Sequence, residues 1–227
     1  MRKAIYFVMD ISILREYIPL YKEALLLTMK IGWQGILLSL IIGLVGSAIL
    51  HFKVTVLKTI IGIYIEIFRN TPLLVQLFFI YFALPKVGIK ITAETCGVLG
   101  LGLLGGAYMI ETFRSGLEAI PVIQTESAFS LGMNEYQTLW HVILPQAISI
   151  SVPGLLANVI FLLKETSVFS TISLMDLMFT AKDLIGMYAK TIECLFLLVV
   201  FYLIMLLPVS IIGAIVERRL RYGQFGD

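Results

Sequence analysis

Charged residues are scarce in this sequence. They make up 14% of its 227 residues, whereas soluble domains carry roughly 25%. Hydrophobic residues reach 59%, and the mean hydropathy is +0.97. This composition excludes an ordinary soluble domain and indicates an integral membrane protein. The formal net charge of only +2 gives no reason to expect binding to nucleic acid.

Cysteine and histidine are also rare, with two of each. Cys96 and Cys194 lie in apolar surroundings and no CxxC pair occurs, so we expect neither a disulfide framework nor a metal site. His51 and His141 are far apart in the sequence, and no nucleophile–base pattern accompanies them. A GxxxxGK[ST] loop is absent, so we expect no catalytic residue, no cofactor and no ATP hydrolysis in this chain. The N-terminal apolar stretch is too short for a signal-peptide core, so we expect the N-terminus to be retained.

Long apolar stretches dominate the chain, and five of them reach the ~20 residues that a helix needs to cross a bilayer. The predicted spans are approximately 24–50, 54–84, 96–117, 142–164 and 191–216. They predict an all-α fold in which residues 1–227 form a single transmembrane domain. In the third stretch, Gly102 and Gly106 have GxxxG spacing, which indicates either close helix packing or simply the frequency of glycine in such helices. Residues 166–190 are only semi-apolar and predict short helices or a partly re-entrant connection.

The distribution of basic residues predicts the orientation in the membrane. Five spans place the two termini on opposite sides. The C-terminal segment "ERRLRYG" carries three arginines, and the 51–58 loop carries Lys53 and Lys58. Because cytoplasmic loops are rich in Lys and Arg, we expect the C-terminus and this loop in the cytoplasm and the N-terminus outside. The polar stretch 118–141 then also faces the cytoplasm.

The second apolar stretch contains the unusual segment "IEIFRNTPLLVQL", residues 65–77. Residues three or four apart share a helix face, so Glu66, Arg69 and Asn70 form one polar stripe. An ionised residue near the bilayer centre costs ~2.5–3.5 kcal/mol, so the stripe should face the helix bundle or a wet cavity. Within the helix, Glu66 and Arg69 are placed to form a structural ion pair.

Pro72 interrupts the same stretch, since it lacks a backbone donor and disfavours helical angles at the preceding residue. We therefore expect a kink or a break at 68–71. Transporters commonly build substrate sites at broken helices near the midplane. Two interpretations stay open: a structural ion pair beside a kink, or direct contact with a substrate. The candidate substrate contacts here are Asn70, Thr71 and Gln76.

A second polar group lies at the end of the fourth span. Lys164, Glu165 and Ser167 supply a cation, an anion and a hydroxyl, the three kinds of group that an amino acid needs. The alternative is that Lys164 extends to the membrane interface and Glu165 merely pairs with it. In the third span, Glu111 lies three residues before Arg114, which favours a structural or gating pair over substrate contact.

The polar stretch 118–141 predicts a helix–turn–helix. A first helix over 125–131 would end at Gly132, and Asn134 with Gln137 has the spacing of a capping box for a second helix. The side chains expected to face outward are Phe129, Met133 and Tyr136. They indicate either a docking surface or an amphipathic loop lying on the lipid.

The same stretch carries a family motif. Glu126, Ala128 and Gly132, followed by Leu144 and Pro145, have the spacing of the EAA loop of ABC-importer permease subunits. Ser127 and Val142 are mild departures from that pattern. Other segments, among them "FRNTPLLVQLFF" and "AYMIETFRSGLEAIP", also resemble the polar amino-acid permease branch of these importers.

This resemblance implies a type I importer permease fold with five transmembrane helices and a cytoplasmic coupling helix–turn–helix. It also implies a bacterial cytoplasmic-membrane subunit for ATP-driven import of a polar amino acid such as glutamine, glutamate, arginine, histidine or cystine. The implied partners are ATPase subunits that hold ATP and Mg, a second permease chain (identical or paralogous), and an extracytoplasmic solute-binding protein.

Three alternatives remain at this point. The cargo could be another small solute, such as a metal chelate or an opine. The chain could be a secondary transporter or channel that needs no ATPase, or a membrane scaffold whose ion pairs are only structural. The helix–turn–helix favours the importer, and a bulky residue at Gly132 would uncouple transport only in that case.

Overall fold

A computed structural model describes residues 11–51 and 55–225. Residues 1–10 and Lys53 lie outside this part of the chain, so the retained N-terminus and one lysine of the 51–58 loop have no structural counterpart. The described residues form helices joined by short connections and contain no strand. The predicted all-α fold is therefore confirmed.

Of the helical elements in the described residues, five are long and eight are short. The long helices are α1 (Ile11–His51), α2 (Thr55–Arg69), α4 (Ala93–Glu118), α7 (Leu144–Glu165) and α9 (Thr191–Phe225). The short α-helices are α3 (Leu73–Phe78), α5 (Val122–Ser130), α6 (Glu135–Thr138) and α8 (Leu177–Tyr188). The π-helices are η1 (Phe79–Ala83) and η3 (Leu139–Ile143), and the 3-10 helices are η2 (Leu84–Val87) and η4 (Thr166–Ile172). Within the described residues, four helical stretches are long and apolar enough to cross a membrane, and the bent pair 56–69 with 73–87 makes a fifth if it counts as one span.

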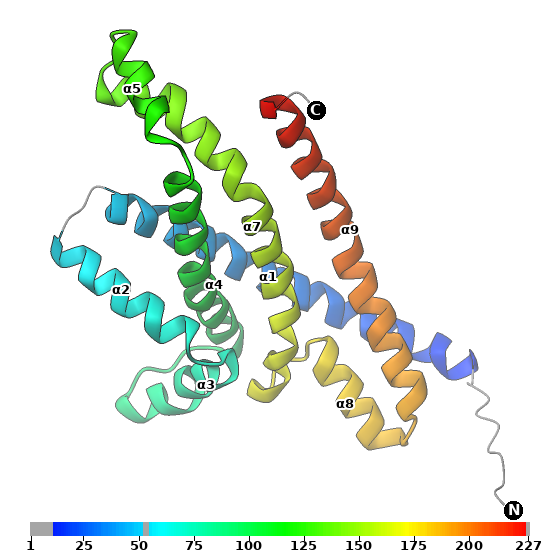
Figure 1. Ribbon diagram of the computed structural model, residues 1–227. Helices are drawn as coiled ribbons and strands as arrows, with labels where there is room; N and C mark the ends of the chain where they lie inside the picture. Colours follow the sequence, from blue (N-terminus) through cyan, green and yellow to red (C-terminus); the bar gives the residue numbers. More distant parts are fainter. Residues whose placement is uncertain (1–10, 52–54, 226–227) are drawn as a thin grey trace, which may run out of the picture.

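Helix α4 lies at the centre of the molecule, with α1, α2 and α7 packed around it (Figure 1). Its glycines allow this close approach. A Cβ atom at Gly106 would lie 2.6 Å from Ile42 Cγ2 and 2.7 Å from Tyr64 Oη, and one at Gly102 would overlap Leu38. The close-packing interpretation of the GxxxG pair is confirmed, because α1 and α2 occupy the space that larger side chains would need.

Helix α1 is longer than the predicted span 24–50, since it begins at Ile11 and runs for 41 residues. Its N-terminal part packs against α8 and α9 (Figure 1). There Tyr21 is fully buried, and its hydroxyl donates a 2.7 Å hydrogen bond to the carbonyl of Cys194. Charges such as Arg15 and Glu16 interrupt the apolar pattern in this part of the sequence, and for that reason hydropathy did not predict it.

The semi-apolar segment 166–190 forms η4 and α8, so the prediction of short helices is confirmed. Asp176 is the N-cap residue directly before α8, and its carboxylate accepts hydrogen bonds from the backbone nitrogens of Met178 (3.3 Å) and Phe179 (3.0 Å). Such a cap satisfies two backbone donors that the helix itself leaves unpaired. The side chain is fully buried, and this burial raises the pKa of Asp176 to about 7.

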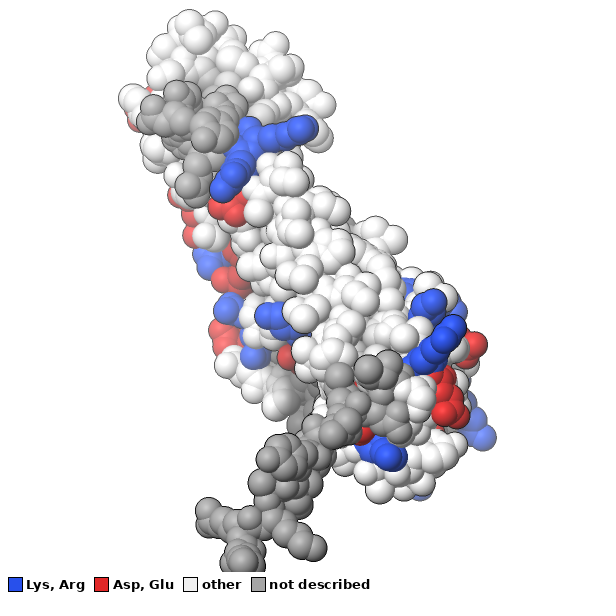
Figure 2. Space-filling view, turned by 90° about the vertical axis from the view of Figure 1, so that its right-hand side faces the viewer, with Lys and Arg blue, Asp and Glu red and all other residues white. Residues whose placement is uncertain are grey.

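The surface has the character of a membrane protein. Figure 2 shows a face on which Lys, Arg, Asp and Glu lie at the margins and toward the two ends, with a broad uncharged expanse between them. Large apolar side chains of α9 are exposed, among them Leu203, Leu207 and Ile211. This surface suits contact with lipid tails, which leave no penalty for exposed apolar side chains.

Candidate functional site

The second predicted span is sharply bent. Helix α2 stops at Arg69 and helix α3 begins at Leu73. The chain bends by 103° between the segments 56–69 and 73–87. Between them Pro72 has extended backbone angles (φ −62°, ψ 143°), which the missing N–H and the proline ring favour. The interruption predicted at 68–71 is confirmed, and it is a full break rather than a kink.

Gln76 holds this bend together. Its side-chain nitrogen donates to the carbonyl of Phe68 (3.0 Å), the carbonyl of Thr71 (3.0 Å) and the hydroxyl of Thr71 (2.9 Å). The two carbonyls are groups that the broken helix leaves without their usual backbone partners. Gln76 is only 8% exposed, and it does not line the cavity at the bend. The structure therefore places Gln76 as a brace behind that cavity.

A cavity of about 380 Å³, here called the bend cavity, opens beside the break. Its lining consists of Arg69, Asn70, Thr71, Pro72, Leu73, Leu74, Leu104, Tyr108, Phe161, Glu165 and Val168. Three of the predicted substrate contacts thus come together: Asn70 and Thr71 from the bend, and Glu165 from the end of α7. The other two from α7 and η4, Lys164 and Ser167, are not part of this lining.

Aromatic side chains form another wall of the bend cavity. Tyr108 of α4 and Phe161 of α7 are in edge contact, with ring centroids 5.3 Å apart. Neither Tyr108 nor Phe161 was singled out from the sequence as a candidate contact. Their pairing depends on how α4 and α7 pack, which is a tertiary property.

The predicted ion pair between Glu66 and Arg69 is wrong. Among the described residues, no ion pair within 4.0 Å joins them; Arg69 Nη1 instead lies 3.7 Å from Glu111 Oε2 on α4. The Arg69 guanidinium also lies 5.2 Å from the centre of the Tyr108 ring, within the range of a cation–π contact. Glu66 accepts a 2.9 Å hydrogen bond from Asn70 Nδ2. Glu66 therefore pairs with Asn70, directly after the end of α2, and Arg69 pairs with Glu111 on α4.

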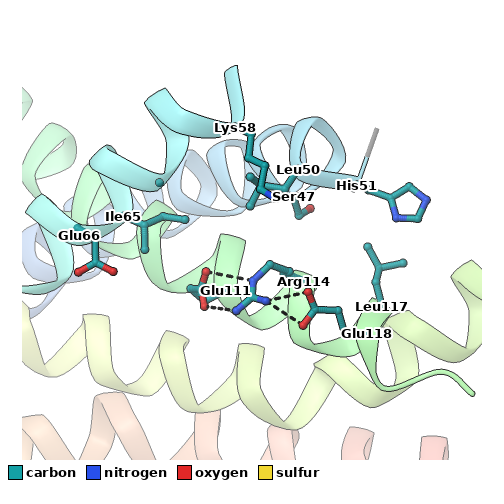
Figure 3. Close-up of a pocket in the computed structure, with 11 residues that line it drawn as sticks. Ser47, Leu50, His51, Lys58, Ile65, Glu66, Glu111, Arg114, Leu117 and Glu118 are labelled. Carbon is teal, nitrogen blue, oxygen red and sulfur yellow. Dashed lines mark hydrogen bonds and ion pairs between the residues drawn. The ribbon is translucent and has the colours of Figure 1, made fainter. Parts of the chain in front are cut away.

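Glu111 and Arg114 form the pair that their spacing predicted. Arg114 donates to both carboxylate oxygens of Glu111, from Nε to Oε1 (3.2 Å) and from Nη2 to Oε2 (2.8 Å). It also donates from Nη1 to both oxygens of Glu118, at 2.7 and 2.8 Å. Arg69, Glu111, Arg114 and Glu118 therefore form one continuous ion-pair chain, whose last three members lie along α4 (Figure 3).

Two further cavities lie along this ion-pair chain. The middle cavity, about 410 Å³, shares Arg69 and Tyr108 with the bend cavity. The α1–α2 cavity, about 450 Å³, lies where α1 ends and α2 begins, and it shares Glu111 and Arg114 with the middle cavity (Figure 3). The three cavities thus form a row along α4, and each has both polar and apolar residues in its lining.

The predicted helix–turn–helix is present as α5 and α6, at the same end of the molecule as the end of α9 (Figure 1). Helix α5 ends in a left-handed Gly132 (φ +82°), with hydrogen bonds from Gly132 N to Phe129 O (2.9 Å) and from Met133 N to Ala128 O (3.1 Å). This is the Schellman arrangement. Asn134 and Gln137 form the predicted capping box through hydrogen bonds of 2.9 and 3.0 Å.

The motif residues of this loop divide between surface and interior. Glu126 and Gly132 are exposed on the hairpin, whereas Ala128 is buried beneath it. Leu144 and Pro145 begin α7, directly after the π-helix η3. Large apolar side chains exposed on the hairpin include Val122, Ile123, Phe129, Leu131 and Tyr136, and Leu131 is 82% exposed. Met133, which we expected to face outward, is only partly exposed. In the part of the chain that the structure describes, no group of three or more His, Cys, Asp or Glu residues is placed to hold a metal.

Comparison with known proteins identifies the family. Residues 35–222 match the model of the family described as "Binding-protein-dependent transport system inner membrane component". Among curated proteins, the chain is 35% identical over 175 residues to the probable glutamine ABC transporter permease protein GlnP of Bacillus subtilis (strain 168), a match covering 77% of this chain and 80% of the relative. It is 31% identical over 221 residues to the probable glutamine ABC transporter permease protein GlnM of the same organism, covering 93% and 98%.

A solved structure agrees with these relatives. The crystal structure of an amino acid ABC transporter with histidines superposes with a TM-score of 0.87 at 32% identity, covering 93% of this chain and 99% of that chain. The resemblance inferred from the motif is confirmed. The chain therefore belongs to the family of binding-protein-dependent transport system inner membrane components, as a multi-pass permease subunit and not itself an enzyme.

Proposed function

We propose that this permease subunit imports a polar amino acid in an ATP-driven complex, with glutamine as the first candidate. The two curated relatives above carry glutamine in their names, and the solved structure is described as an amino acid transporter. Glutamine is the candidate to test first because both relatives are named for it. Other polar amino acids share its α-ammonium and α-carboxylate, so the same cavity chemistry would recognise them.

The bend cavity is the observation that carries this proposal. Its volume of about 380 Å³ lies within the ~300–1,000 Å³ typical of small-molecule sites. Its walls combine one carboxylate, Glu165, with one guanidinium, Arg69, and with the amide of Asn70 and the ring of Tyr108. A zwitterion needs opposite charges at separate points, and this cavity offers them on different helices.

The exposed surfaces support a proposed arrangement of partners. The α5–α6 hairpin, with exposed Phe129 and Leu131, would dock on a separate ATPase subunit that holds ATP and Mg. A second permease chain, identical or paralogous, would cover the open sides of the three cavities. The hairpin and the C-terminus would then face the cytoplasm, and the N-terminus and a solute-binding protein would lie on the opposite side.

The substrate site is tested by uptake of radiolabelled glutamine into proteoliposomes that contain the complete complex and its binding protein. Glu165→Gln and Asn70→Ala should each reduce uptake to about a tenth of the wild-type rate or less. Each variant removes a polar contact with the substrate that is worth roughly a factor of ten. Asp183→Asn, at an exposed position of α8, is the matched acid-to-amide control and should keep wild-type uptake. Near-normal uptake by Glu165→Gln, with unchanged substrate preference, would contradict the proposed site.

The coupling role is tested at Gly132. A leucine there is strained because φ is +82°, a region that residues with a Cβ rarely adopt. Gly132→Leu should therefore abolish ATP-dependent uptake while glutamine binding to the complex persists. Gly186→Leu is the control, since a Cβ at Gly186 would meet nothing within 4 Å. A secondary transporter or channel would keep its transport in both variants.

A further inference from the structure

We propose that the segment 73–90, here called the limb, lies in the membrane interface and binds the headgroups of anionic phospholipids through Lys86 and Lys90. The limb comprises α3, η1, η2 and the turn that follows them. The occupant of its exposed side is a lipid surface and not a protein partner. This inference does not depend on which solute the complex imports.

The limb leaves the direction of α2 at the break. Because the chain bends there by 103°, the limb does not continue across the bilayer along the axis of α2. It lies at the end of the molecule opposite the α5–α6 hairpin and leads into the start of α4 (Figure 1). There Lys30 and Glu94 form an exposed ion pair of 2.7 Å. Exposed charges are costly in hydrocarbon, so the start of α4, and with it the end of the limb, lies among the headgroups.

The limb has one buried side and one exposed apolar side. The buried residues are Leu73, Gln76, Leu77 and Ile80. The exposed apolar residues, here called the aromatic face, are Val75, Phe78, Phe79 and Phe82. The members of each set lie one, three or four residues apart, which gathers each set on one side of a helical segment. An apolar face of this kind on a helical segment at the membrane boundary suits burial at the border between headgroups and acyl chains.

A hydrogen-bonded turn ends the limb. Gly88 has a left-handed backbone (φ +89°), and its nitrogen donates to the carbonyl of Pro85 (3.2 Å). The nitrogen of Ile89 donates to the carbonyl of Leu84 (3.1 Å). These two bonds form a Schellman arrangement, so the turn holds the side chains around it in a fixed display.

Two lysines flank the apolar tip of this turn. Val87 is 73% exposed, and Ile89 is exposed beside it. Lys86 and Lys90 lie directly before and after them; both are exposed, and among the described residues neither has an acidic partner within 4.0 Å. Free cations beside apolar side chains match a phospholipid surface, where acyl chains lie beneath phosphates. An acidic protein surface would pair with the lysines but would leave the adjoining aromatic face without a role.

Quenching of tryptophan fluorescence by brominated lipid tests this contact. Phe82→Trp in the complete permease–ATPase complex places a reporter on the aromatic face, and the complex without this change gives the background from Trp33 and Trp140. The complex is reconstituted in an equal mixture of phosphatidylglycerol and phosphatidylcholine, with bromine on the chains of one lipid or of the other. Quenching of the reporter should be stronger when phosphatidylglycerol carries the bromine.

The lysines should account for this preference. Lys86→Gln and Lys90→Gln should each lower it by about fivefold, which corresponds to the ~1 kcal/mol of one lysine near an anionic membrane surface, and the double variant should remove it. Lys22→Gln is the matched control. Lys22 is also exposed, but Glu23 follows it, and it belongs to the part of α1 on the far side of the molecule from α3 (Figure 1). This variant should keep the wild-type preference.

A reporter that neither mixture quenches would show that a protein chain covers the limb, and it would overturn the proposal. Equal quenching in the two mixtures, or a preference that survives in the double variant, would overturn it as well. If Phe82→Trp fails to assemble, Phe79→Trp provides a second reporter on the same face. The readout needs no solute, so a complex that does not import glutamine would contradict the proposed function and still decide the question of lipid binding.

Discussion

Gln76 ties the two sides of the α2–α3 bend together with hydrogen bonds from a single amide nitrogen. In a membrane interior, water cannot replace this amide as the donor to the carbonyls of Phe68 and Thr71, so losing the amide leaves them unsatisfied. These hydrogen bonds also fix Asn70 and Thr71, because Gln76 binds Thr71 directly and Phe68 on the other side of Asn70. Both residues line the bend cavity. One buried side chain therefore sets the shape of the candidate site without touching its contents.

Gln76→Leu should lower the free energy of unfolding by about 1–3 kcal/mol, since it removes a donor from buried acceptors. The measurement is the thermal midpoint of the purified complex in detergent. Lys30→Gln breaks only an exposed ion pair and should change stability by about 0–1 kcal/mol. Equal midpoints for the two variants would mean that the bend does not depend on Gln76.

Asp176 makes the stability of the chain depend on pH. Burial raises its pKa from an ordinary 3.8 to about 7, so between these values the folded protein keeps a proton that the unfolded chain has released. This contribution is complete below pH ~4 and is lost as the pH rises through ~7. The thermal midpoint of the wild type, relative to that of Asp176→Asn, should therefore fall from about pH 5 to about pH 8. Asparagine also caps helices well, so a difference that stays constant with pH would exclude Asp176 as the titrating group.

Packing between helices is decided on α4, where glycine allows α1 and α2 to approach. Gly106→Val would place its Cβ 2.6 Å from Ile42 and 2.7 Å from Tyr64, and overpacking of this kind costs about 1–3 kcal/mol. We expect a lower thermal midpoint and a lower yield of assembled complex. Gly62→Ala is the control on α2, since a Cβ there meets nothing within 4 Å. It should be neutral or slightly stabilising because alanine favours helix.

Local features of these elements were predictable from the sequence, and non-local ones were not. The break follows from Pro72, and the hairpin caps follow from Gly132, Asn134 and Gln137, because each acts within a few residues of itself. Glu111, the partner of Arg69, lies on α4, 42 residues further along the chain. No pattern within α2 predicts this contact. The apolar pattern did not predict the N-terminal extension of α1, because its buried residues pack against α8 and α9, which are distant in the sequence.

The orientation of the entire chain across the membrane can be tested by labelling. Cys96 and Cys194 are both 0% exposed, so the native chain should give little background with a thiol reagent. In intact cells, a membrane-impermeant maleimide should label Lys90→Cys, in the connection before α4, but not Ser130→Cys on the α5–α6 hairpin. Permeabilised cells should label both. The reverse pattern in intact cells would invert the proposed orientation.

The ion-pair chain has an electrical consequence. Arg69, Glu111, Arg114 and Glu118 are two cations and two anions, so their charges cancel across this part of the bilayer. A zwitterion that passes along them also carries no net charge. A membrane potential acts on net charge, at about 2.3 kcal/mol per elementary charge and 100 mV, and so it should neither drive nor oppose the passage of glutamine. Uptake into proteoliposomes should keep the same rate when a potassium diffusion potential of either sign is imposed.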